Sequence, residues 1–459
     1  MGNNLYNLIQ KYGISGPRYT SYPPAPIFSG NFDAAAYKQE IIGTESNPAN
    51  PALSLYVHIP FCDTLCYFCG CTTMITRNRI HVDEYLRYLK KEIDLLARLL
   101  NPQRRVVQMH WGGGTPTYLS PTQIAELGLY VRKSFTFDTR PEISVEVDPR
   151  QLTYDHLRAL RDVGFNRISL GVQDFDQKVQ HAVNRNQSEF ITRQAVDWSR
   201  ELGFASLNVD LIYGLPLQSV ESFNFTLDKI IEIDPERIAV YNFAYVPWMK
   251  KHQRVLHLED LPSPETKLAL LTNTIHRLSG ASYNYIGMDH FAKADDELTI
   301  AQKNRTLRRN FQGYSTRSGS DLYGLGVSAI SHFGTTYAQN AKTLPEYSKA
   351  IEAGEFATHT GYRMTFDDEV RKSVIMKIMC DFVLDVSEIE IKFGIRFSEY
   401  FAGTLSNLQP FIDDGLLFAT PSHLAVSGAG RLFLRNIAMC FDAYHAQAPS
   451  EQPLYSRTV

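Results

Sequence analysis

The chain has 459 residues, enough for two or three domains or for one large domain with additions. Its net charge of −3 excludes a general nucleic-acid binder, which needs a basic excess to neutralise phosphates. The first residues show no signal-peptide pattern, and no apolar run approaches the roughly 18 residues of a membrane span. We therefore expect a cytoplasmic protein.

Residues 1–48 are rich in Pro, Gly and Tyr, and we expect them to form a loop-like N-terminal arm. Short apolar runs then alternate with amphipathic stretches. The apolar runs predict strands at 54–60, 106–111, 143–148, 167–172, 207–214 and 237–243. The amphipathic stretches predict helices at 82–100, 121–135, 154–164, 188–203 and 220–234.

This alternation implies βαβ units and a parallel sheet. Polar residues at the strand ends favour an α/β fold with a partial (β/α)6-type TIM barrel, whose chemistry lies at the carboxyl ends of its strands. We expect this catalytic domain to span 49–355.

The pattern changes after residue 356, where helical stretches precede a hairpin-like segment at 416–428. We expect a mostly helical, winged-helix-like domain over 356–459. Winged helices often bind DNA, but residues 361–445 carry 11 acidic and 8 basic side chains. A packing or lid role is therefore favoured over DNA binding.

Four of the six cysteines, at positions 62, 66, 69 and 71, follow the first predicted strand. A structural zinc site usually needs a second Cys-x2-Cys knuckle or paired histidines, and disulfides are not expected without an export signal. A thioredoxin-type pair would leave Cys62 and Cys71 unexplained. Because thiolates are preferred ligands of iron–sulfur clusters, three of these cysteines favour a cluster with one open iron, with zinc as the alternative.

The Cys-x3-Cys-aromatic-x-Cys motif resembles that of the radical S-adenosylmethionine (SAM) superfamily. The chain is also similar to the oxygen-independent coproporphyrinogen III oxidases within it, from about residue 12 to RNIAMCFD. The motifs that carry this resemblance are SGPRYTSYP, YVHIPFCDTLCYFCGC, HWGGGTPTYL, SVEVDPR, GVQDF, NVDLIYGLP, IGMDHFA and NFQGYST.

The resemblance implies a [4Fe–4S] cluster ligated by Cys62, Cys66 and Cys69. Cys71 is then surplus to ligation, and its chemistry cannot be derived from the sequence. It is typical of the oxidase branch rather than the sister branch of haem chaperones.

Several polar or glycine positions are candidates for binding SAM. Gly113, Gly114 and Thr115 end the second strand in a glycine-rich segment, where the backbone can approach a ligand closely. Glu146 lies late in the third strand, where a carboxylate could accept hydrogen bonds from ribose hydroxyls or from the amino group of methionine. The alternative for Glu146 is a buried salt bridge.

Gln173, Arg185 and Asp210 are polar groups on or beside apolar elements, as in a lined pocket. The resemblance implies that two SAM molecules lie beside each other, and that these three residues serve the second. It also implies SAM contacts for Tyr56, Phe68, Ala244 and Ile330.

A further glycine motif, Gly324–Gly326–Ala329, resembles the dinucleotide fingerprint GxGxxA. No βαβ unit or preceding strand is predicted to frame it, so it is a weak signal for NAD. The resemblance places this segment around the adenine of SAM.

Coproporphyrinogen III carries four propionates on a broad apolar ring system, so its site needs cations and aromatic surface. Arg18, Arg308 and Arg309 are candidates for these cations, although such an arginine taken by itself is more often a solvated surface charge. Family members often carry His at the position of Arg308, which puts a proton-transfer role there in doubt.

The resemblance implies a reaction in which SAM gives a 5′-deoxyadenosyl radical that takes a hydrogen from the β-carbon of a propionate. Loss of CO2 and one electron leaves a vinyl group, and two such events give protoporphyrinogen IX. An unidentified electron donor and electron acceptor are implied, and we expect a monomer. A haem chaperone or a haem-degrading relative is the alternative within the superfamily.

Overall fold

The computed structural model describes residues 2–47, 50–317, 319–445, 455–456 and 458. A twelve-stranded sheet forms the centre of the molecule, in the order β16-β15-β14-β13-β1-β4-β5-β6-β7-β8-β10-β9. Its parallel part confirms the predicted α/β part-barrel. The parallel strands are β1 (Leu53–Ile59), β4 (Arg105–Gly113), β5 (Thr136–Val147), β6 (Arg167–Gln173), β7 (Ser206–Tyr213), β8 (Arg237–Asn242) and β13 (Asp321–Leu325).

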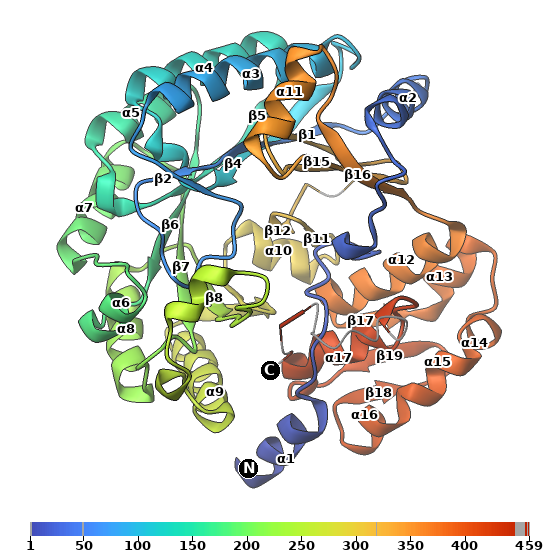
Figure 1. The fold of residues 1–459 in the computed structure, drawn as a ribbon. Coiled ribbons are helices and arrows are strands. Elements are labelled where there is room, and N and C mark those ends of the chain that lie inside the picture. Colours follow the sequence, from blue (N-terminus) through green and yellow to red (C-terminus); the bar gives the residue numbers. More distant parts are fainter. Residues whose placement is uncertain (1, 48–49, 318, 446–454, 457, 459) are drawn as a thin grey trace.

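Helices between these strands cover the outer face of the sheet (Figure 1). All five predicted helices are present, and Ser120 and Ser219 begin two of them with capping boxes, as is typical of a helix start. The helices are α3 (Ile80–Ala97), α4 (Pro121–Ser134), α5 (Tyr154–Asp162), α6 (Gln177–Ala182), α7 (Glu189–Glu201), α8 (Val220–Ile233) and α9 (Pro264–Gly280).

The alternation of side chains along each strand decides what fills the barrel. In β6, Ile168, Leu170 and Val172 are buried in the core, whereas Ser169 and Gln173 are half-buried. Because successive side chains point to opposite faces, the apolar set packs under the helices and the polar set lines the interior. The polar interior is where the candidate site lies.

Antiparallel strands extend the sheet at both edges, and a small hairpin lies beside it. The strands at one edge continue to Arg363, past the predicted domain boundary at residue 355, so the division into 1–48, 49–355 and 356–459 stays a prediction. These elements are β9 (Tyr283–Gly287), β10 (His290–Lys293), α10 (Glu297–Lys303), β11 (Arg308–Asn310), β12 (Gly313–Ser315), β14 (Ile330–Phe333), β15 (Thr336–Asn340), α11 (Leu344–Glu352) and β16 (Thr358–Arg363).

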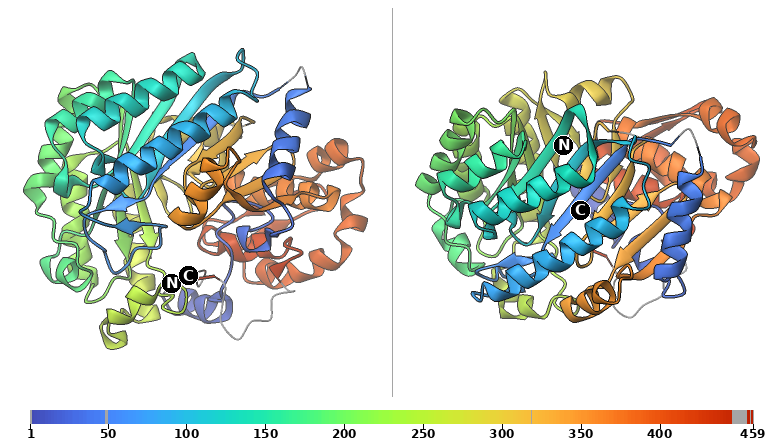
Figure 2. Two further views of the ribbon diagram at one scale, coloured as in Figure 1. Left: turned by 45° about the horizontal axis from the view of Figure 1, so that its top comes forward. Right: turned by 90° about the horizontal axis from the view of Figure 1, so that it is seen from above.

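The C-terminal region is mostly helical, as predicted, with a three-stranded antiparallel sheet in the order β17-β19-β18. It lies beside the open side of the part-barrel (Figures 1 and 2). Its elements are α12 (Phe366–Asp381), β17 (Val383–Asp385), α13 (Val386–Phe393), α14 (Phe397–Tyr400), α15 (Ala402–Asn407), α16 (Gln409–Asp413), β18 (Leu417–Ala419), β19 (His423–Val426) and α17 (Leu434–Met439).

We expected a loop-like N-terminal arm, but the structure shows that part of the arm is helical. It contains α1 (Gly2–Tyr12) and α2 (Ala34–Glu45), with the Asp33 side chain accepting a hydrogen bond from the Ala36 N–H at the start of α2. Leu8 and Tyr12 of α1 are buried in the core of the C-terminal region, so tertiary packing stabilises this short helix. The extended stretch between them passes between the barrel and the C-terminal region (Figure 1).

Within the described part of the chain, no helix is both long and apolar enough to cross a bilayer.

Candidate active site

Two cavities meet at the carboxyl ends of the parallel strands. The first, of about 400 Å³, contains the cysteine loop in its wall. The second, of about 540 Å³, lies under the N-terminal arm and the β11–β12 hairpin. They share a wall made by Gly70, Cys71, Gly113, Glu146 and Tyr241.

The cysteine loop is held from two sides by segments that follow other barrel strands. After β6, the Val183 carbonyl accepts from the Tyr67 N–H at 2.9 Å, and Asn184 donates to the Leu65 carbonyl at 2.8 Å. After β8, His252 lies 2.9 Å from the Cys69 carbonyl and Lys250 donates to the Cys71 carbonyl at 3.2 Å. The loop conformation is therefore fixed by the barrel.

Two guanidinium groups surround the sulfur of Cys66. Arg150 Nη2 lies 3.5 Å from it and Arg185 Nη1 lies 3.7 Å from it. Asp148 bridges both arginines, at 2.6 Å from Arg150 and 3.1 Å from Arg185. Burial alone would raise the pKa of Asp148, but the two arginines outweigh it and lower that pKa to about 2.

The other thiols of the loop differ in their surroundings. Burial raises the pKa of the Cys62 thiol to about 12, with Thr115 Oγ1 3.4 Å from its sulfur. The hydrogen bond from the Cys71 thiol lowers the pKa of Cys69 to about 6 and, correspondingly, raises the pKa of Cys71. The hydrogen bond from Cys71 thus stabilises negative charge on the sulfur of Cys69.

These residues fit an iron–sulfur cluster. Cys62, Cys66 and Cys69 all line the first cavity, and the cationic groups around Cys66 compensate thiolate charge. No group of three or more His, Cys, Asp or Glu side chains within the described ranges is arranged to hold a single metal ion. Each thiolate of a cubane cluster meets its own iron, so the cluster does not require convergence on one point.

The three glycines at the end of β4 are required by protein packing. A Cβ on Gly113 would lie 2.5 Å from the ring of His58, and one on Gly114 would lie 2.7 Å from the Pro60 and Phe61 backbone. Gly113 also has a φ of 114°, which other residues rarely adopt. The glycines therefore let the ends of β4 and β1 approach closely and bring Thr115 beside Cys62.

Glu146 lies in the shared wall of the two cavities, with 42% of its side chain exposed to them. It accepts hydrogen bonds from the Gly113 N–H at 3.1 Å and from His110 Nε2 at 3.2 Å. Burial would raise its pKa, but these donors keep the pKa lowered. A carboxylate that still has accepting capacity thus faces both cavities.

Gln173, Arg185 and Asp210 line the first cavity together with the cysteines. Asp210 accepts from Ser169 and Asn208, each at 2.8 Å, and burial raises its pKa to about 6. Gln173 ends β6 with a positive φ of 70°, a strained conformation that is common at functional sites.

The remaining predicted SAM residues divide between the cavities. Phe68, Gly114 and Thr115 line the first, and Tyr56 and Ile330 line the second. Ala244 lines neither; it faces a third cavity of about 420 Å³ beside Tyr245, and its carbonyl accepts from Gln253.

The predicted substrate cations are also separated by the structure. Arg18 and Arg309 line the second cavity, and Arg18 forms an ion pair with Asp289. Arg308 is exposed, lines neither cavity and hydrogen-bonds the Leu307 carbonyl. The alternation of β11 separates the two adjacent arginines.

The chain is similar in sequence to known families of proteins. Residues 56–230 match the model of the Radical SAM superfamily, and residues 364–433 match the HemN C-terminal domain. The oxygen-independent coproporphyrinogen III oxidase of Salmonella typhimurium is 48% identical over 98% of both chains. The enzyme of that name from Synechocystis sp. is 45% identical, over 98% of this chain and 97% of its own.

The chain belongs to the oxygen-independent coproporphyrinogen III oxidase family. A solved structure titled as coproporphyrinogen III oxidase (HemN) from Escherichia coli, a radical SAM enzyme, superposes with a TM-score of 0.91 at 47% identity. It covers 96% of this chain and 98% of its own. The predicted family, fold and oxidoreductase class are confirmed, and the family implies a [4Fe–4S] cluster and SAM as cofactors.

The glycine motif at 324–329 has a structural explanation in this radical SAM fold. The strand β13 precedes it, contrary to our expectation, but β14 follows instead of a helix, so no βαβ unit forms. The Gly326 N–H donates to the buried Glu92 at 2.6 Å, and a Cβ there would collide with Tyr85. Ser328 and Ala329 then turn into the wall of the second cavity.

Sequence reasoning missed several site residues of this family member. Asp148 and Arg150 follow the end of β5, and a charged pair in that position could have been predicted to line the site. Tyr241 and His290 lie on β8 and β10 with no distinguishing sequence pattern. Phe311 and Gln312 lie in the NFQGYST motif, which indicated the family but gave neither residue a role in the site.

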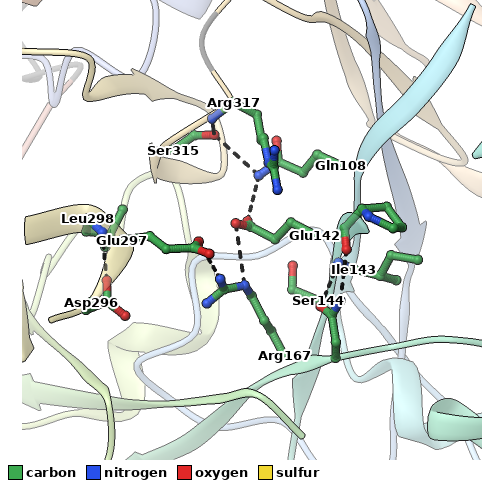
Figure 3. A network of polar contacts seen from close by, with 12 residues as sticks. Gln108, Glu142, Ile143, Ser144, Arg167, Asp296, Glu297, Leu298, Ser315 and Arg317 are labelled. Carbon is green, nitrogen blue, oxygen red and sulfur yellow. Dashed lines mark hydrogen bonds and ion pairs between the residues drawn. The ribbon is translucent and has the colours of Figure 1, made fainter. Parts of the chain in front are cut away.

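A polar network inside the barrel links its strands to the β11–β12 hairpin (Figure 3). Gln108 donates to Glu142 at 2.9 Å and to Ser315 of β12 at 3.3 Å. Arg167 pairs with Glu142 at 3.4 Å and also with Glu297. The hairpin that carries Arg309 is therefore tied to β4, β5 and β6.

Proposed function

We propose that this chain converts coproporphyrinogen III to protoporphyrinogen IX by oxygen-independent oxidative decarboxylation of two propionates. The observation that carries this proposal is the pairing of the two cavities. A cysteine-lined cavity shares a wall, which contains Glu146 and Tyr241, with a cavity lined by arginines and aromatic rings. The first suits a cluster with SAM, and the second suits an apolar macrocycle with carboxylates.

We assign cluster ligation to Cys62, Cys66 and Cys69. When bound, the cluster and SAM supply the one-electron chemistry that removes a hydrogen atom from an unactivated carbon. Each conversion then removes one hydrogen atom, one electron and CO2 from a propionate and leaves a vinyl group. The electron leaves to an acceptor, and a separate donor reduces the cluster; the fold identifies neither.

We assign Gln173, Arg185 and Asp210 to the SAM at the cluster, because they line the same cavity as the cysteines. This revises the expectation that they serve a second SAM. Asp210 and Glu146 offer carboxylate oxygens to hydroxyl or amino groups, and Phe68 offers an apolar surface. A second SAM, if the family's pair carries over, would lie beside Tyr56 and Ile330.

We assign the porphyrinogen to the second cavity. Arg18 and Arg309 supply cations, and Tyr241 and Phe311 supply aromatic surface. The N-terminal arm brings Arg18 into this wall because Tyr19 donates to Asp442 at 2.9 Å and the Arg435 Nε donates to the Pro17 carbonyl at 3.0 Å. The C-terminal region thus positions the arm over the barrel. We further propose that the enzyme acts as a cytoplasmic monomer.

An anaerobic product assay tests the proposal. Cluster-loaded enzyme with SAM, a chemical reductant, an electron acceptor and coproporphyrinogen III should release CO2 and form a product with two vinyl groups. The matched control carries Cys66→Ala and should form none. Intact coproporphyrinogen after incubation with active, SAM-cleaving enzyme would contradict the assignment and would favour a haem-handling relative.

A further inference from the structure

We propose that Arg309 anchors a propionate that the reaction keeps, so that it orients the macrocycle without holding the group that is lost. This inference rests on the proposed function, since it concerns how the second cavity takes its substrate. Arg309, His290 and Gln312 together form this carboxylate-binding subsite.

Arg309 is a buried cation that forms no ion pair with any residue that the structure describes. Only 7% of the residue is exposed, and it lines the second cavity. Its Nε donates to the Arg18 carbonyl at 3.4 Å, and its guanidinium lies 4.8 Å from the centre of the Tyr314 ring. Across the residues that the structure describes, its Nη1 has no hydrogen-bond partner and no carboxylate lies within ion-pairing distance.

Burying an unpaired charge is costly, so such a group usually has a partner that arrives with a ligand. The surroundings increase this cost. Arg18 and Arg435 lie near enough to affect Arg309 electrostatically, and burial together with Arg18 lowers the pKa of Arg435 to about 9. Asp289 forms an ion pair with Arg18 and Glu146 accepts from Gly113 and His110, so neither carboxylate is paired with Arg309.

Two further polar groups beside Arg309 suit a carboxylate. His290 Nδ1 and Gln312 Nε2 are buried, and neither has a hydrogen-bond partner in the described parts of the chain. Both residues line the second cavity. Burial, and then Arg309 and Arg18, keep the pKa of His290 well below its ordinary value, so its neutral ring has one N–H to donate. A planar carboxylate with two oxygens can accept from several such donors at once.

The location of the subsite separates it from the reacting carbon. Arg309, His290 and Gln312 line the second cavity and not the first, whereas Cys62, Cys66 and Cys69 line the first and not the second. A carboxylate bound at Arg309 therefore lies across the shared wall from the thiolates. The macrocycle can span this separation with one propionate anchored and another at the wall.

The charge of the reacting carboxylate also favours a retained propionate as the group that Arg309 binds. The reacting carboxylate loses its negative charge when it leaves as CO2. A guanidinium bound to that carboxylate would stabilise the ground state more than the transition state and would slow the reaction. A guanidinium bound to a retained propionate contributes binding energy equally before and after the chemical step.

The test compares two tetrapyrroles and three variants. Coproporphyrin III carries all four propionates, and protoporphyrin IX carries only the two that are kept. The affinity of each is measured by fluorescence titration of anaerobic, cluster-loaded enzyme with SAM present. The variants are Arg309→Gln, Arg309→Lys, and the adjacent exposed Arg308→Gln as the matched control; cluster content and SAM affinity are measured in each.

Arg309→Gln should weaken both tetrapyrroles by the same factor, roughly tenfold or more. Arg309→Lys should recover part of the affinity, because it restores the charge without the planar fork. Arg308→Gln, cluster content and SAM affinity should stay unchanged. The chemical denaturation midpoint of ligand-free Arg309→Gln should not fall, since an unpaired buried cation is removed.

Three results would overturn the proposal. Loss of affinity for coproporphyrin III alone would mean that Arg309 binds a reacting propionate. Unchanged affinity for both would mean that it binds no carboxylate of the substrate. A changed SAM affinity with unchanged tetrapyrrole binding would assign Arg309 to the methionine carboxylate. The binding assay is independent of turnover, so failure of the product assay is a separate outcome.

Discussion

Arg150 Nη2 lies 3.5 Å from the sulfur of Cys66, and the same guanidinium is held by Asp148 at 2.6 Å. The contact places a fixed positive charge beside a predicted cluster ligand. Like Arg185, Arg150 lines the first cavity, but it follows β5 and belongs to a short 3-10 helix, Pro149–Gln151. Hydrogen bonds and charges near cluster sulfurs tune reduction potentials.

Replacing Arg150 with Gln should lower the midpoint potential of the cluster, because the reduced cluster loses the positive charge that stabilises its added electron. The shift should be on the order of tens of millivolts, since one arginine of several groups is removed. A redox titration followed by electron paramagnetic resonance measures it. Arg158→Gln, on the exposed face of α5, is the control. An unchanged or raised potential in Arg150→Gln would refute the contact's role.

The cysteines should separate into three ligands and one neighbour. Cys62→Ala, Cys66→Ala and Cys69→Ala should each lose the thiolate–iron absorbance and most of the bound iron after anaerobic reconstitution. Cys71→Ala should retain both, because Cys71 only donates a hydrogen bond to the sulfur of Cys69. Iron and sulfide analysis with absorbance spectra decides this. Cluster loss in all four variants would require four ligands.

Gly114→Ala should disrupt the site by moving backbone. The added Cβ would lie 2.7 Å from the Pro60 and Phe61 backbone, where no flexible side chain can give way. We expect a loss of about 1–3 kcal/mol in the free energy of unfolding, together with weaker SAM binding. Denaturant unfolding and SAM titration measure the two effects. Gly403→Ala, where an added Cβ meets nothing within 4 Å, should show neither; comparable values for the two variants would contradict the packing role.

A buried lysine predicts a pH dependence of stability. Lys372 of α12 lies 2.7 Å from His332 Nε2, and its ammonium is 5.0 Å from the Tyr337 ring centre. Burial lowers its pKa from 10.5 to about 7. Between these values the unfolded chain binds one more proton than the folded chain, so the free energy of unfolding rises with pH from 7 to 10.5.

Lys372→Met should remove the part of the pH dependence of the unfolding free energy that is due to Lys372. The stability of the wild type relative to Lys372→Met should increase across that window, on the order of a few kcal/mol in total. Below pH 7 the difference should be constant. Urea unfolding at several pH values, with the exposed Lys342→Met as control, measures it. A flat difference would show that Lys372 keeps an ordinary pKa in the folded protein, and a difference that falls with pH would show that its pKa is raised; either result would contradict the prediction.

The sequence was sufficient for the elements of the barrel because their signals are local and periodic. All six predicted strands and all five predicted helices of the part-barrel are present. It failed for α1 and α2, which depend on burial of Tyr12 and Tyr37 against distant segments. It also missed β13, whose five residues lie between β1 and β14 and gain their sheet partners only in the folded chain.

The site was predictable to a different extent. Cysteine spacing and strand-end position indicated the cluster loop, and polar residues within otherwise apolar strands indicated Glu146 and Asp210. Which cavity each residue lines depends on how the strands curve. The sequence therefore could not show that Gln173 lines the first cavity, Tyr56 the second and Ala244 the third. Likewise, only the folded hairpin shows that Arg309 is buried while Arg308 is exposed.

Transfer of isotope from substrate to SAM tests the central claim most directly. Coproporphyrinogen III carrying deuterium on the β-carbons of its propionates is incubated anaerobically with the cluster-loaded enzyme, SAM, reductant and an electron acceptor. Mass spectrometry should find deuterium in the 5′-deoxyadenosine, in step with formation of the vinyl product. Unlabelled 5′-deoxyadenosine accompanying vinyl product, or label transfer without any vinyl product, would contradict the account.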